Sequence, residues 1–272
     1  MNFSVLMSVY KNDNPDFFRT AVESVLVNQT VKPNELVLVV DGPVPESLKQ
    51  MILNVQQECN EVKIIWLDKN GGLGNALKIG LSECSNEVVA RMDSDDIASA
   101  TRFQQQLEYI DNNPAIDIVG GQITEFIDSP DNIVGRREVP YDCASLKEYT
   151  KRRCPFNHMT VMFRKSAVLK SGGYEDWHYN EDYFLWIRML LTECKFANLP
   201  QVLVNVRVGK DMYARRGGWK YFKSEAGIQR YMFDKGLISF PRYGYNVLGR
   251  FVLQVVMPNS LRAFLFQKLF RK

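Results

Sequence analysis

The chain has 272 residues, 46% of them hydrophobic and 24% charged, with a formal net charge of +3. This composition excludes global disorder and suits one large α/β domain with a small appendage. The small net charge gives no indication of nucleic-acid binding, so we expect no nucleic-acid partner. The cysteines are odd in number and form no Cys-x-x-Cys pair, which predicts reduced thiols and excludes a disulfide framework or zinc site; they are residues 59, 84, 143, 154 and 194.

The first half of the chain alternates strand-like and helix-like segments. Continuous apolar runs predict strands, and apolar residues at helical spacing predict helices. We expect strands at Phe3–Val9, Glu35–Val40, Val62–Leu67, Glu87–Met92 and Ile116–Gly120, and helices at Phe17–Val27, 46–59, 71–81 and Ala100–Asp111. This order predicts an α/β fold with a mixed, mainly parallel sheet and helices on both faces.

The second half of the chain is less regular. A hairpin is expected over Ile123–Val139, with its turn at 129–132, and a strand over Met159–Arg164. An amphipathic helix is expected over Tyr183–Cys194, followed by a strand over Val202–Val208. We therefore expect a catalytic domain over residues 1–210 and a helical C-terminal extension over 211–272.

Polar clusters follow the first, second and fourth expected strands, where parallel α/β sheets bind ligands. After the fourth strand, Asp93 and Asp95 stand one residue apart. Two such carboxylates can share a hard divalent cation, Mn²⁺ or Mg²⁺, and a ribose. The alternative for a single Asp-x-Asp is a solvated acidic turn, and the companion motifs favour the metal site.

Two further segments suit a nucleotide. Asp41 ends the second strand and can accept a hydrogen bond from a base, or can instead cap the next helix or begin a turn. The glycines that follow Asn70 allow close approach of the backbone to a phosphate at a helix N-terminus, although an ordinary strand-to-helix turn has the same composition.

Glu181 and Asp182 open the amphipathic helix of the second half. A carboxylate there can act as a general base toward an acceptor hydroxyl, or can simply stabilise the helix N-terminus. On the same helix, Trp186 can offer a ring face to a sugar or pack in the core. His158 begins a strand near the expected acceptor side, although a hydrogen-bonded structural role is the commoner one for such a residue.

With these motifs in order, the chain resembles the inverting glycosyltransferases of family 2, which have the GT-A fold. The resemblance covers roughly residues 3–210. Its motifs are Ser8-Val9-Tyr10, Asp41-Gly42, Asn70-Gly71-Gly72-Leu73 with Asn75-Ala76, Arg91-Met92-Asp93-Ser94-Asp95-Asp96, and Asn180-Glu181-Asp182 followed by Trp186. Five ordered motifs make the resemblance specific, where any one alone would be weak.

The resemblance implies a role for each matching residue. Asp41 holds the base, Asp93 contacts the ribose or the metal shell, and Asp95 binds the metal. Asp182 is the catalytic base, and Glu181 beside it contacts the acceptor or the donor sugar. The other expected contacts to the nucleotide sugar come from Val9, Tyr10, Asn70, Gly71 and Arg91, and those to the acceptor from Trp186 and His158.

The segment from Arg207 to Gly218 is similar to a subgroup that builds bacterial O-antigen and exopolysaccharide units, amylovoran-type enzymes among them. That similarity implies a UDP-glucose or UDP-galactose donor, a polyprenyl diphosphate-linked sugar acceptor and a β-linked product. Arg215 is expected to close over the diphosphate, or else to lie in a basic surface loop. Some relatives place a metal-binding histidine in this region, and none follows His178, so diphosphate and water are expected to complete the metal shell.

The last 38 residues carry seven basic side chains and no acidic one, interleaved with aromatic and aliphatic residues. Pro258 is expected to divide Tyr243–Lys272 into two helices that lie on an anionic membrane, or that pack against the domain. The N-terminal run has no basic leader, and no apolar stretch is long enough to span a bilayer. We expect a cytoplasmic protein with peripheral contact at the inner membrane.

Three other functions fit the sequence less well. A haloacid-dehalogenase-type phosphatase places a different residue pattern after its second aspartate, where this chain has Asp96 and Ile97. A sugar nucleotidyltransferase needs a glycine- and arginine-rich loop after the first strand, where this chain has Tyr10-Lys11-Asn12-Asp13. A catalytically inactive module that binds nucleotide sugars or polysaccharide has no need of the base Asp182.

Overall fold

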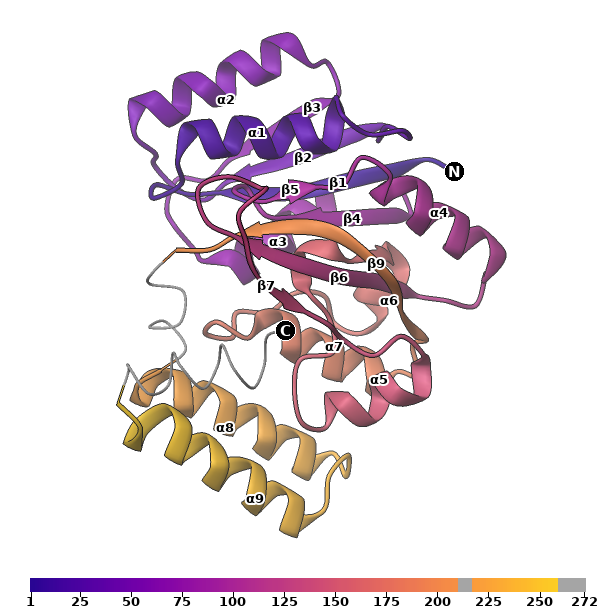
Figure 1. Ribbon diagram of the computed structural model, residues 1–272, viewed down its shortest axis with the longest axis vertical. Helices are drawn as coiled ribbons and strands as arrows, with labels where there is room; N and C mark the ends of the chain where they lie inside the picture. The colour runs from indigo at the N-terminus through magenta and orange to yellow at the C-terminus, as the bar shows by residue number, and fades with distance from the viewer. Residues whose placement is uncertain (210–216, 259–272) are drawn as a thin grey trace.

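The structure is a computed structural model that describes residues 1–209 and 217–258 (Figure 1). Its first half forms four parallel strands: β1 (Phe3–Val9), β2 (Glu35–Val40), β3 (Val62–Trp66) and β4 (Val88–Met92). They lie in the order β3-β2-β1-β4, so their carboxyl ends share one edge. All four predicted strands are confirmed to within about a residue at each end.

The second half extends the same sheet with mostly antiparallel strands. Beyond β4 the order continues with β8, β6, β9 and β5, and β7 pairs with β6 in the predicted hairpin. Strand β9 runs parallel to β6, which makes the whole sheet mixed. The bounds are β5 Ile97–Ala98, β6 Ile118–Phe126, β7 Ile133–Arg137, β8 Met162–Arg164 and β9 Phe196–Arg207.

Three of the predicted strands have different bounds in the structure. The strand predicted over Ile116–Gly120 is β6, which begins at Ile118 and continues to Phe126 through the first part of the predicted hairpin. A short 3-10 turn, η1 (His158–Thr160), takes the first part of the strand predicted from Met159, so only β8 pairs with the sheet. Strand β9 begins six residues earlier than predicted, at Phe196. Its alignment beside β6 supplies backbone hydrogen-bond partners to residues that the hydrophobic pattern left out.

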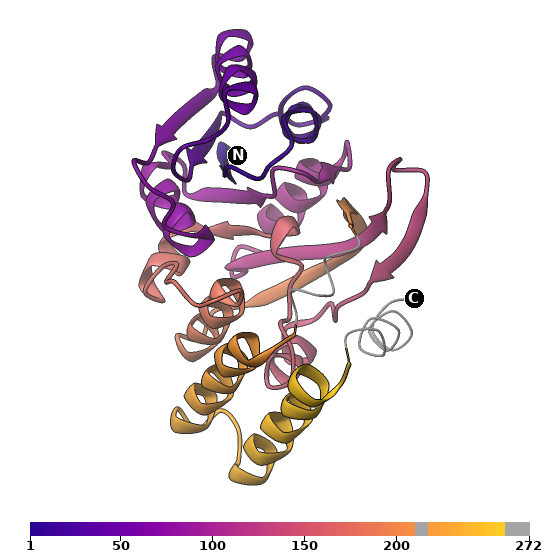
Figure 2. The same cartoon turned by 90° about the vertical axis from the view of Figure 1, so that its left-hand side faces the viewer.

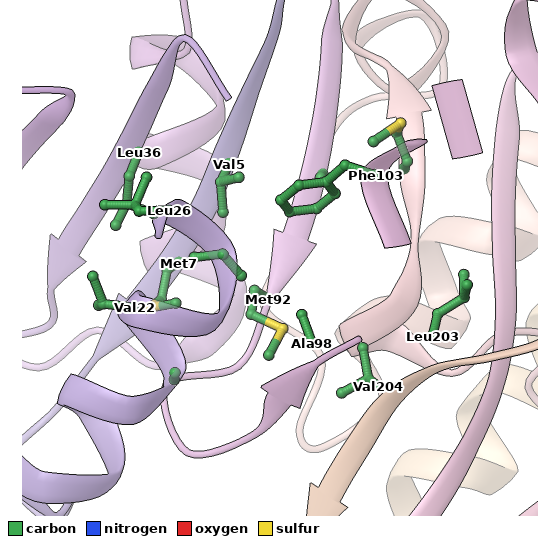
Figure 3. Close-up of a cluster of buried hydrophobic side chains, with 14 of the residues drawn as sticks. Val5, Met7, Val22, Leu26, Leu36, Met92, Ala98, Phe103, Leu203 and Val204 are labelled. Carbon is green, nitrogen blue, oxygen red and sulfur yellow. The ribbon is translucent and has the colours of Figure 1, made fainter. Parts of the chain in front are cut away.

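Helices cover both faces of the sheet, as predicted. On one face, α1 (Pro15–Leu26), α2 (Glu46–Glu58) and α4 (Arg102–Asn112) pack over alternate residues of β1 and β2 (Figure 3). On the other face lie α3 and α7 with the shorter α5 and α6. Their bounds are α3 Leu73–Glu83, α5 Cys143–Thr150, α6 Lys165–Lys170 and α7 Glu181–Leu191.

Two further helices, α8 (Trp219–Asp234) and α9 (Phe240–Phe251), lie at the end of the molecule opposite α2 (Figures 1 and 2). A short π-helical segment, η3 (Val252–Val256), continues α9. Ile228 and Met232 of α8 pack against Ile187 of α7 in a small separate core. Within residues 1–209 and 217–258, no helix has both the length and the hydrophobicity that are needed to cross a membrane.

Candidate active site

The loops after β1, β2, β3 and β4 meet at the edge where these parallel strands end. At this edge the backbone N–H of Asp41 donates to the carbonyl of Val9, with 2.8 Å between the atoms. The hydroxyl of Ser94 donates to the carboxylate of Asp13 at 2.8 Å, which joins the loop after β4 to the loop after β1. The sequence motifs of the first half therefore come together in space.

Asp41 fixes the loop that follows β3. Its carboxylate accepts hydrogen bonds from the backbone N–H of Gly71 at 2.7 Å and of Gly72 at 3.0 Å, and from the side chain of Asn70 at 2.9 Å. Asp41 is only 4% exposed, so it holds the loop in place from beneath. Its predicted contact with a nucleotide base stays a prediction.

Gly42 makes this close approach possible. Its φ is +85°, and a Cβ there would lie 2.4 Å from the backbone nitrogen of Asn70. A side chain at position 42 would therefore push the β3–α3 loop away from Asp41.

Acidic side chains gather after β4. Asp96 is buried and accepts the backbone N–H of Arg207 at 2.9 Å, and the Arg207 side chain donates to the carbonyl of Asp95 at 3.2 Å. Burial of its carboxyl, followed by the charges of Asp93 and Asp13, raises the pKa of Asp95 to about 6. Burial is the larger cause and the neighbouring negative charges add to it, although the residue as a whole is exposed.

Arg91 is the buried counter-charge of this cluster. Its guanidinium forms an ion pair with Asp93, while its Nε and Nη1 atoms have no hydrogen-bond partner among the described residues. The side chain of Arg91 is 2% exposed, so its charge acts through an environment of low polarity. Arg102, also fully buried, donates to the carbonyl of Arg91 at 2.7 Å and so fixes the end of β4 from below.

The two predicted acceptor-side carboxylates lie at the start of α7, against the start of α3. Gly74 of α3 makes this contact possible, because a Cβ there would lie 2.8 Å from the carbonyl of Glu175 and 3.2 Å from the Cβ of Glu181. Burial and the neighbouring charge of Asp182 raise the pKa of Glu181 to about 7. The charges of Arg91 and Asp93 also act on Glu181, which connects α7 to the end of β4.

Asp182 has a partner that the sequence analysis did not single out. The thiol of Cys154 donates to its Oδ2 at 3.4 Å, and the backbone N–H of Tyr183 donates to Oδ1 at 2.6 Å. Burial raises the pKa of Asp182, and these hydrogen bonds oppose the shift. Burial and the Asp182 charge raise the pKa of the Cys154 thiol well above its usual value, so the thiol stays protonated and donates.

The side chains of three predicted contact residues are buried in the protein. The ring of Trp186 is 0% exposed and packs edge-on against Phe156, so the structure corrects the predicted sugar contact to core packing. His158 is buried and hydrogen-bonded to the Tyr174 hydroxyl at 2.9 Å, and burial lowers its pKa well below the usual range. The side chain of Val9 lies in the core, which leaves only its backbone at the site.

Two predicted site residues remain, Tyr10 and Arg215. Tyr10 lies at the edge, and its backbone N–H donates to Asp13 at 3.0 Å. Arg215 lies outside the described residues. Asp13, Cys154 and Tyr174 join the site without having been predicted. Only Asp13 carried a signal, because it belongs to the polar cluster after the first strand.

The resemblance implies a divalent cation, and two carboxylates of this edge are of the kind that bind one. Asp93 and Asp95 supply the hard oxygen donors that Mg²⁺ and Mn²⁺ prefer, and the crowding of negative charge is what a cation would relieve. No group of three or more His, Cys, Asp or Glu side chains able to hold a metal is assembled within the described ranges. Asp93 and Asp95 would therefore hold Mg²⁺ or Mn²⁺ only together with other donors, such as a bound diphosphate.

Known sequences place the chain in a family. The profile of Glycosyl transferase family 2 matches residues 4–172. An amylovoran biosynthesis glycosyltransferase of Erwinia amylovora, AmsE, is 39% identical, with 98% of each chain covered. An Escherichia coli enzyme, UDP-Gal:alpha-D-GlcNAc-diphosphoundecaprenol beta-1,3-galactosyltransferase, is 36% identical, covering 99% of this chain and 97% of its own.

Solved structures agree on the fold. Staphylococcus aureus TarS 1-349, in complex with UDP-GlcNAc, superposes with a TM-score of 0.68 at 17% identity, covering 93% of this chain and 73% of its own. The match to a longer TarS chain spans 44% of that chain. A mannosyltransferase of Pyrobaculum calidifontis gives a TM-score of 0.64 at 12% identity, covering 96% of this chain and 71% of its own. The chain belongs to glycosyltransferase family 2 and has the GT-A fold.

Proposed function

We propose that this glycosyltransferase moves a hexose from UDP-glucose or UDP-galactose onto a polyprenyl diphosphate-linked sugar, in the synthesis of a bacterial surface polysaccharide. The observation that carries the reaction is the contact between α3 and α7 at Gly74, which brings Glu181 and Asp182 beside the loop held by Asp41. The E. coli relative supports the substrate class, because its name describes transfer of galactose to a lipid diphosphate-linked sugar. Its similarity to this chain extends over almost the full length of both chains.

In the proposed mechanism Asp182 removes the proton from the acceptor hydroxyl as that oxygen attacks the anomeric carbon. Its raised pKa makes Asp182 a stronger base than an exposed aspartate. The attack comes from the face opposite the diphosphate, so one displacement turns an α-linked donor into a β-linked product. Arg91, fixed by Asp93, supplies positive charge that acts on Glu181 and Asp182.

The donor diphosphate is proposed to bind at Asp93 and Asp95 together with Mn²⁺ or Mg²⁺. Such a cation would neutralise charge on the leaving diphosphate. The neighbouring charges of Asp93 and Asp13 add to the effect of burial on the pKa of Asp95, so binding of the donor and of the cation should depend on each other. We place the reaction at the cytoplasmic face of the inner membrane, where a lipid-linked acceptor would be presented.

The test is release of nucleoside diphosphate from a panel of nucleotide sugars, with Mn²⁺ or with EDTA. The acceptor is a synthetic N-acetylglucosaminyl diphosphate-lipid, and wild type runs beside Asp182→Asn and Asp95→Ala. We expect acceptor-dependent release from one UDP-hexose, lost with EDTA and reduced by at least about a thousandfold in Asp182→Asn.

Two results would contradict the proposal. Full turnover in Asp182→Asn would remove the assignment of the base, and an α-linked product would remove the single displacement. Tight nucleotide binding without turnover on any sugar-diphosphate-lipid acceptor would favour the binding-module alternative.

A further inference from the structure

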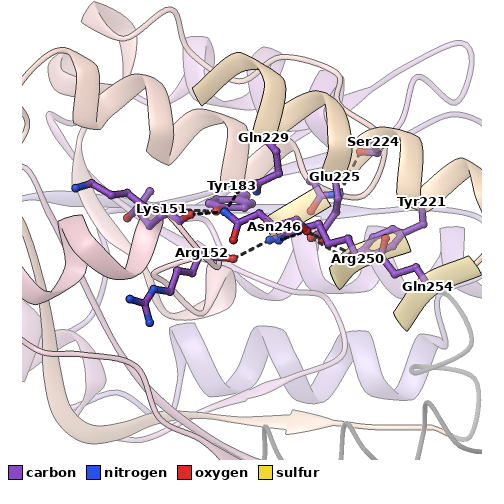
Figure 4. A network of polar contacts seen from close by, with 12 residues as sticks. Lys151, Arg152, Tyr183, Tyr221, Ser224, Glu225, Gln229, Asn246, Arg250 and Gln254 are labelled. Atoms are coloured by element: carbon purple, nitrogen blue, oxygen red, sulfur yellow. Dashed lines mark hydrogen bonds and ion pairs between the residues drawn. The ribbon is translucent and has the colours of Figure 1, made fainter. Parts of the chain in front are cut away.

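Helix α9 carries its polar residues on the side that faces the protein. The side chain of Asn246 donates to the carbonyl of Lys151 at 3.0 Å and to Gln229 of α8 at 2.8 Å (Figure 4). Arg250 forms an ion pair with Glu225 of α8 at 2.6 Å. Asn246 is the buried residue of α9, whereas buried faces of helices are normally apolar.

The opposite side of α9 and η3 is apolar and exposed. Tyr245 is 78% exposed and Leu248 is 65% exposed, and neighbouring residues at helical spacing continue this stripe. Together these side chains form the α9 face, which consists of Trp219, Phe240, Tyr245, Leu248, Val252 and Val256. An apolar stripe turned outward, on a helix whose inner side is polar, indicates a partner other than the protein's own core.

Trp219 joins this face from the start of α8. Its ring lies 6.3 Å from the ring of Phe251, the last residue of α9, with the two rings nearly perpendicular. The Nζ atom of Lys223 lies 5.7 Å from the centroid of the Trp219 ring. Tryptophan and tyrosine beside lysine are typical of a boundary between lipid and water, where an apolar ring and a polar group are both accommodated.

The charge around the α9 face is basic. Lys220, Lys223 and Lys235 are exposed on or next to α8. The acidic residues of α8 are engaged with arginines, Glu225 with Arg250 and Asp234 with Arg230. The chain from residue 235 to its end contains seven basic residues and no acidic one. This balance complements a negatively charged surface.

We propose that the α9 face docks on an anionic lipid bilayer, with its apolar side chains among the headgroups and the lysines against lipid phosphate. A basic, amphipathic helix with exposed aromatic residues is the arrangement that binds in the plane of a membrane. The proposal rests on the proposed function in one respect, because the lipid of a lipid-linked acceptor lies in a bilayer and the enzyme would have to bind its substrate there. A second copy of the chain is the competing occupant, and the excess of basic charge opposes it.

The first test measures binding of the full chain to vesicles, by flotation, without any substrate. Vesicles of neutral phosphatidylcholine are compared with vesicles that also contain phosphatidylglycerol. Tyr245→Ser combined with Leu248→Gln should weaken binding to the anionic vesicles by about tenfold or more, because two apolar side chains no longer enter the bilayer. The matched control is Leu169→Gln on α6, where the native leucine is 52% exposed but lies away from the α9 face.

The second test reports contact directly. Vesicles with brominated acyl chains quench the fluorescence of tryptophans that enter the bilayer. We expect quenching in the wild type that is lost in Trp219→Phe and kept in Trp66→Phe, since Trp66 is comparably exposed, at 44% against 53%, on the edge strand β3. Loss of quenching in Trp66→Phe instead would place the membrane on another surface and overturn the proposal.

Other outcomes also decide the question. Equal flotation of wild type and the double variant, or no binding to anionic vesicles, would remove the α9 face as a membrane site. A dimer in sedimentation that Leu248→Gln dissociates would assign the face to a second copy. Because neither assay contains a sugar donor, failure here leaves the proposed reaction standing, and loss of turnover in Asp182→Asn leaves this proposal standing.

Discussion

A single buried guanidinium connects the two halves of the active site. Arg91 pairs with Asp93 at the end of β4, and its charge acts on Glu181 and Asp182 at the start of α7. The sequence placed Arg91 in the right motif but gave no sign that it is buried, because its counter-charges come from segments about 90 residues apart. Such a contact depends on tertiary packing, which the spacing of hydrophobic residues along the sequence does not reveal.

The hydrogen bond from Cys154 to Asp182 should set the acidic limb of the pH profile. In the proposed mechanism activity requires ionised Asp182, so it falls with decreasing pH through an apparent pKa that burial raises above the ordinary aspartate value of 3.8. Cys154→Ala removes a donor to the charged form and should move this limb upward by up to about one pH unit. The measurement is kcat/KM against pH.

Two variants control this prediction. Cys154→Ser keeps a hydroxyl donor and should keep the limb near its wild-type position. Cys143→Ala removes another partly buried thiol, on α5, and should change nothing in the pH profile. An unshifted limb in Cys154→Ala would show that the thiol does not tune the base.

Within the β2–α2 turn, replacement of Gly42 by alanine should lower the stability of the protein the most. Its positive φ and the 2.4 Å approach to Asn70 predict that Gly42→Ala lowers the free energy of unfolding by about 2 to 4 kcal/mol. Gly236→Ala is the matched control, because Gly236 has a φ of +72° but open space around it, and should cost about 1 kcal/mol. Urea denaturation of both variants measures the difference, and equal losses would show that strain rather than the clash dominates.

At the scale of elements, the sequence predicted the parts of the fold whose residues are buried on both sides. Strands β1, β2 and β4 are almost continuous buried apolar runs, so pattern alone located them, and the half-exposed edge strand β3 was found from its shorter apolar run. Helix α8 falls within the predicted helical extension but received no bounds of its own, because polar Gln229 occupies a fully buried position between Ile228 and Met232. Strand β5 has two residues and exists only through its pairing with β9.

The docking of α9 on α8 should depend on the shielded ion pair between Arg250 and Glu225. Both side chains are at most 14% exposed, and Gln254 also donates to Glu225 at 3.0 Å. Glu225→Gln leaves the Arg250 charge without its carboxylate and should lower the free energy of unfolding by about 2 kcal/mol. Hydrogen exchange should then be faster in α9 than in α7.

The control lies on the same helix. Asp234→Asn removes the exposed pair with Arg230 and should cost less than about 0.5 kcal/mol, with unchanged exchange in α9. Equal effects of the two variants would mean that the Arg250 pair adds nothing specific to the docking of α9.

At the scale of the whole molecule, the proposed donor site and the proposed catalytic base come from different parts of the chain. The family profile ends at residue 172, before the helix that carries Asp182. We therefore expect Asp95→Ala to weaken UDP binding in the presence of Mn²⁺ by at least about tenfold, and Asp182→Asn to change it by less than about twofold. Calorimetric titration of both variants measures this, and a large loss in Asp182→Asn would show that the base also holds the donor.

The carboxylate of Asp41 has a consequence for how donor affinity is obtained. Because it already holds the backbone of Gly71 and Gly72, the loop is ordered when the protein folds rather than when a ligand arrives. The entropy of ordering that loop is lost during folding, so it does not reduce the free energy of donor binding. Conformational stability and donor affinity are thereby linked through one side chain, and heating should loosen this loop and weaken donor binding together before the protein unfolds.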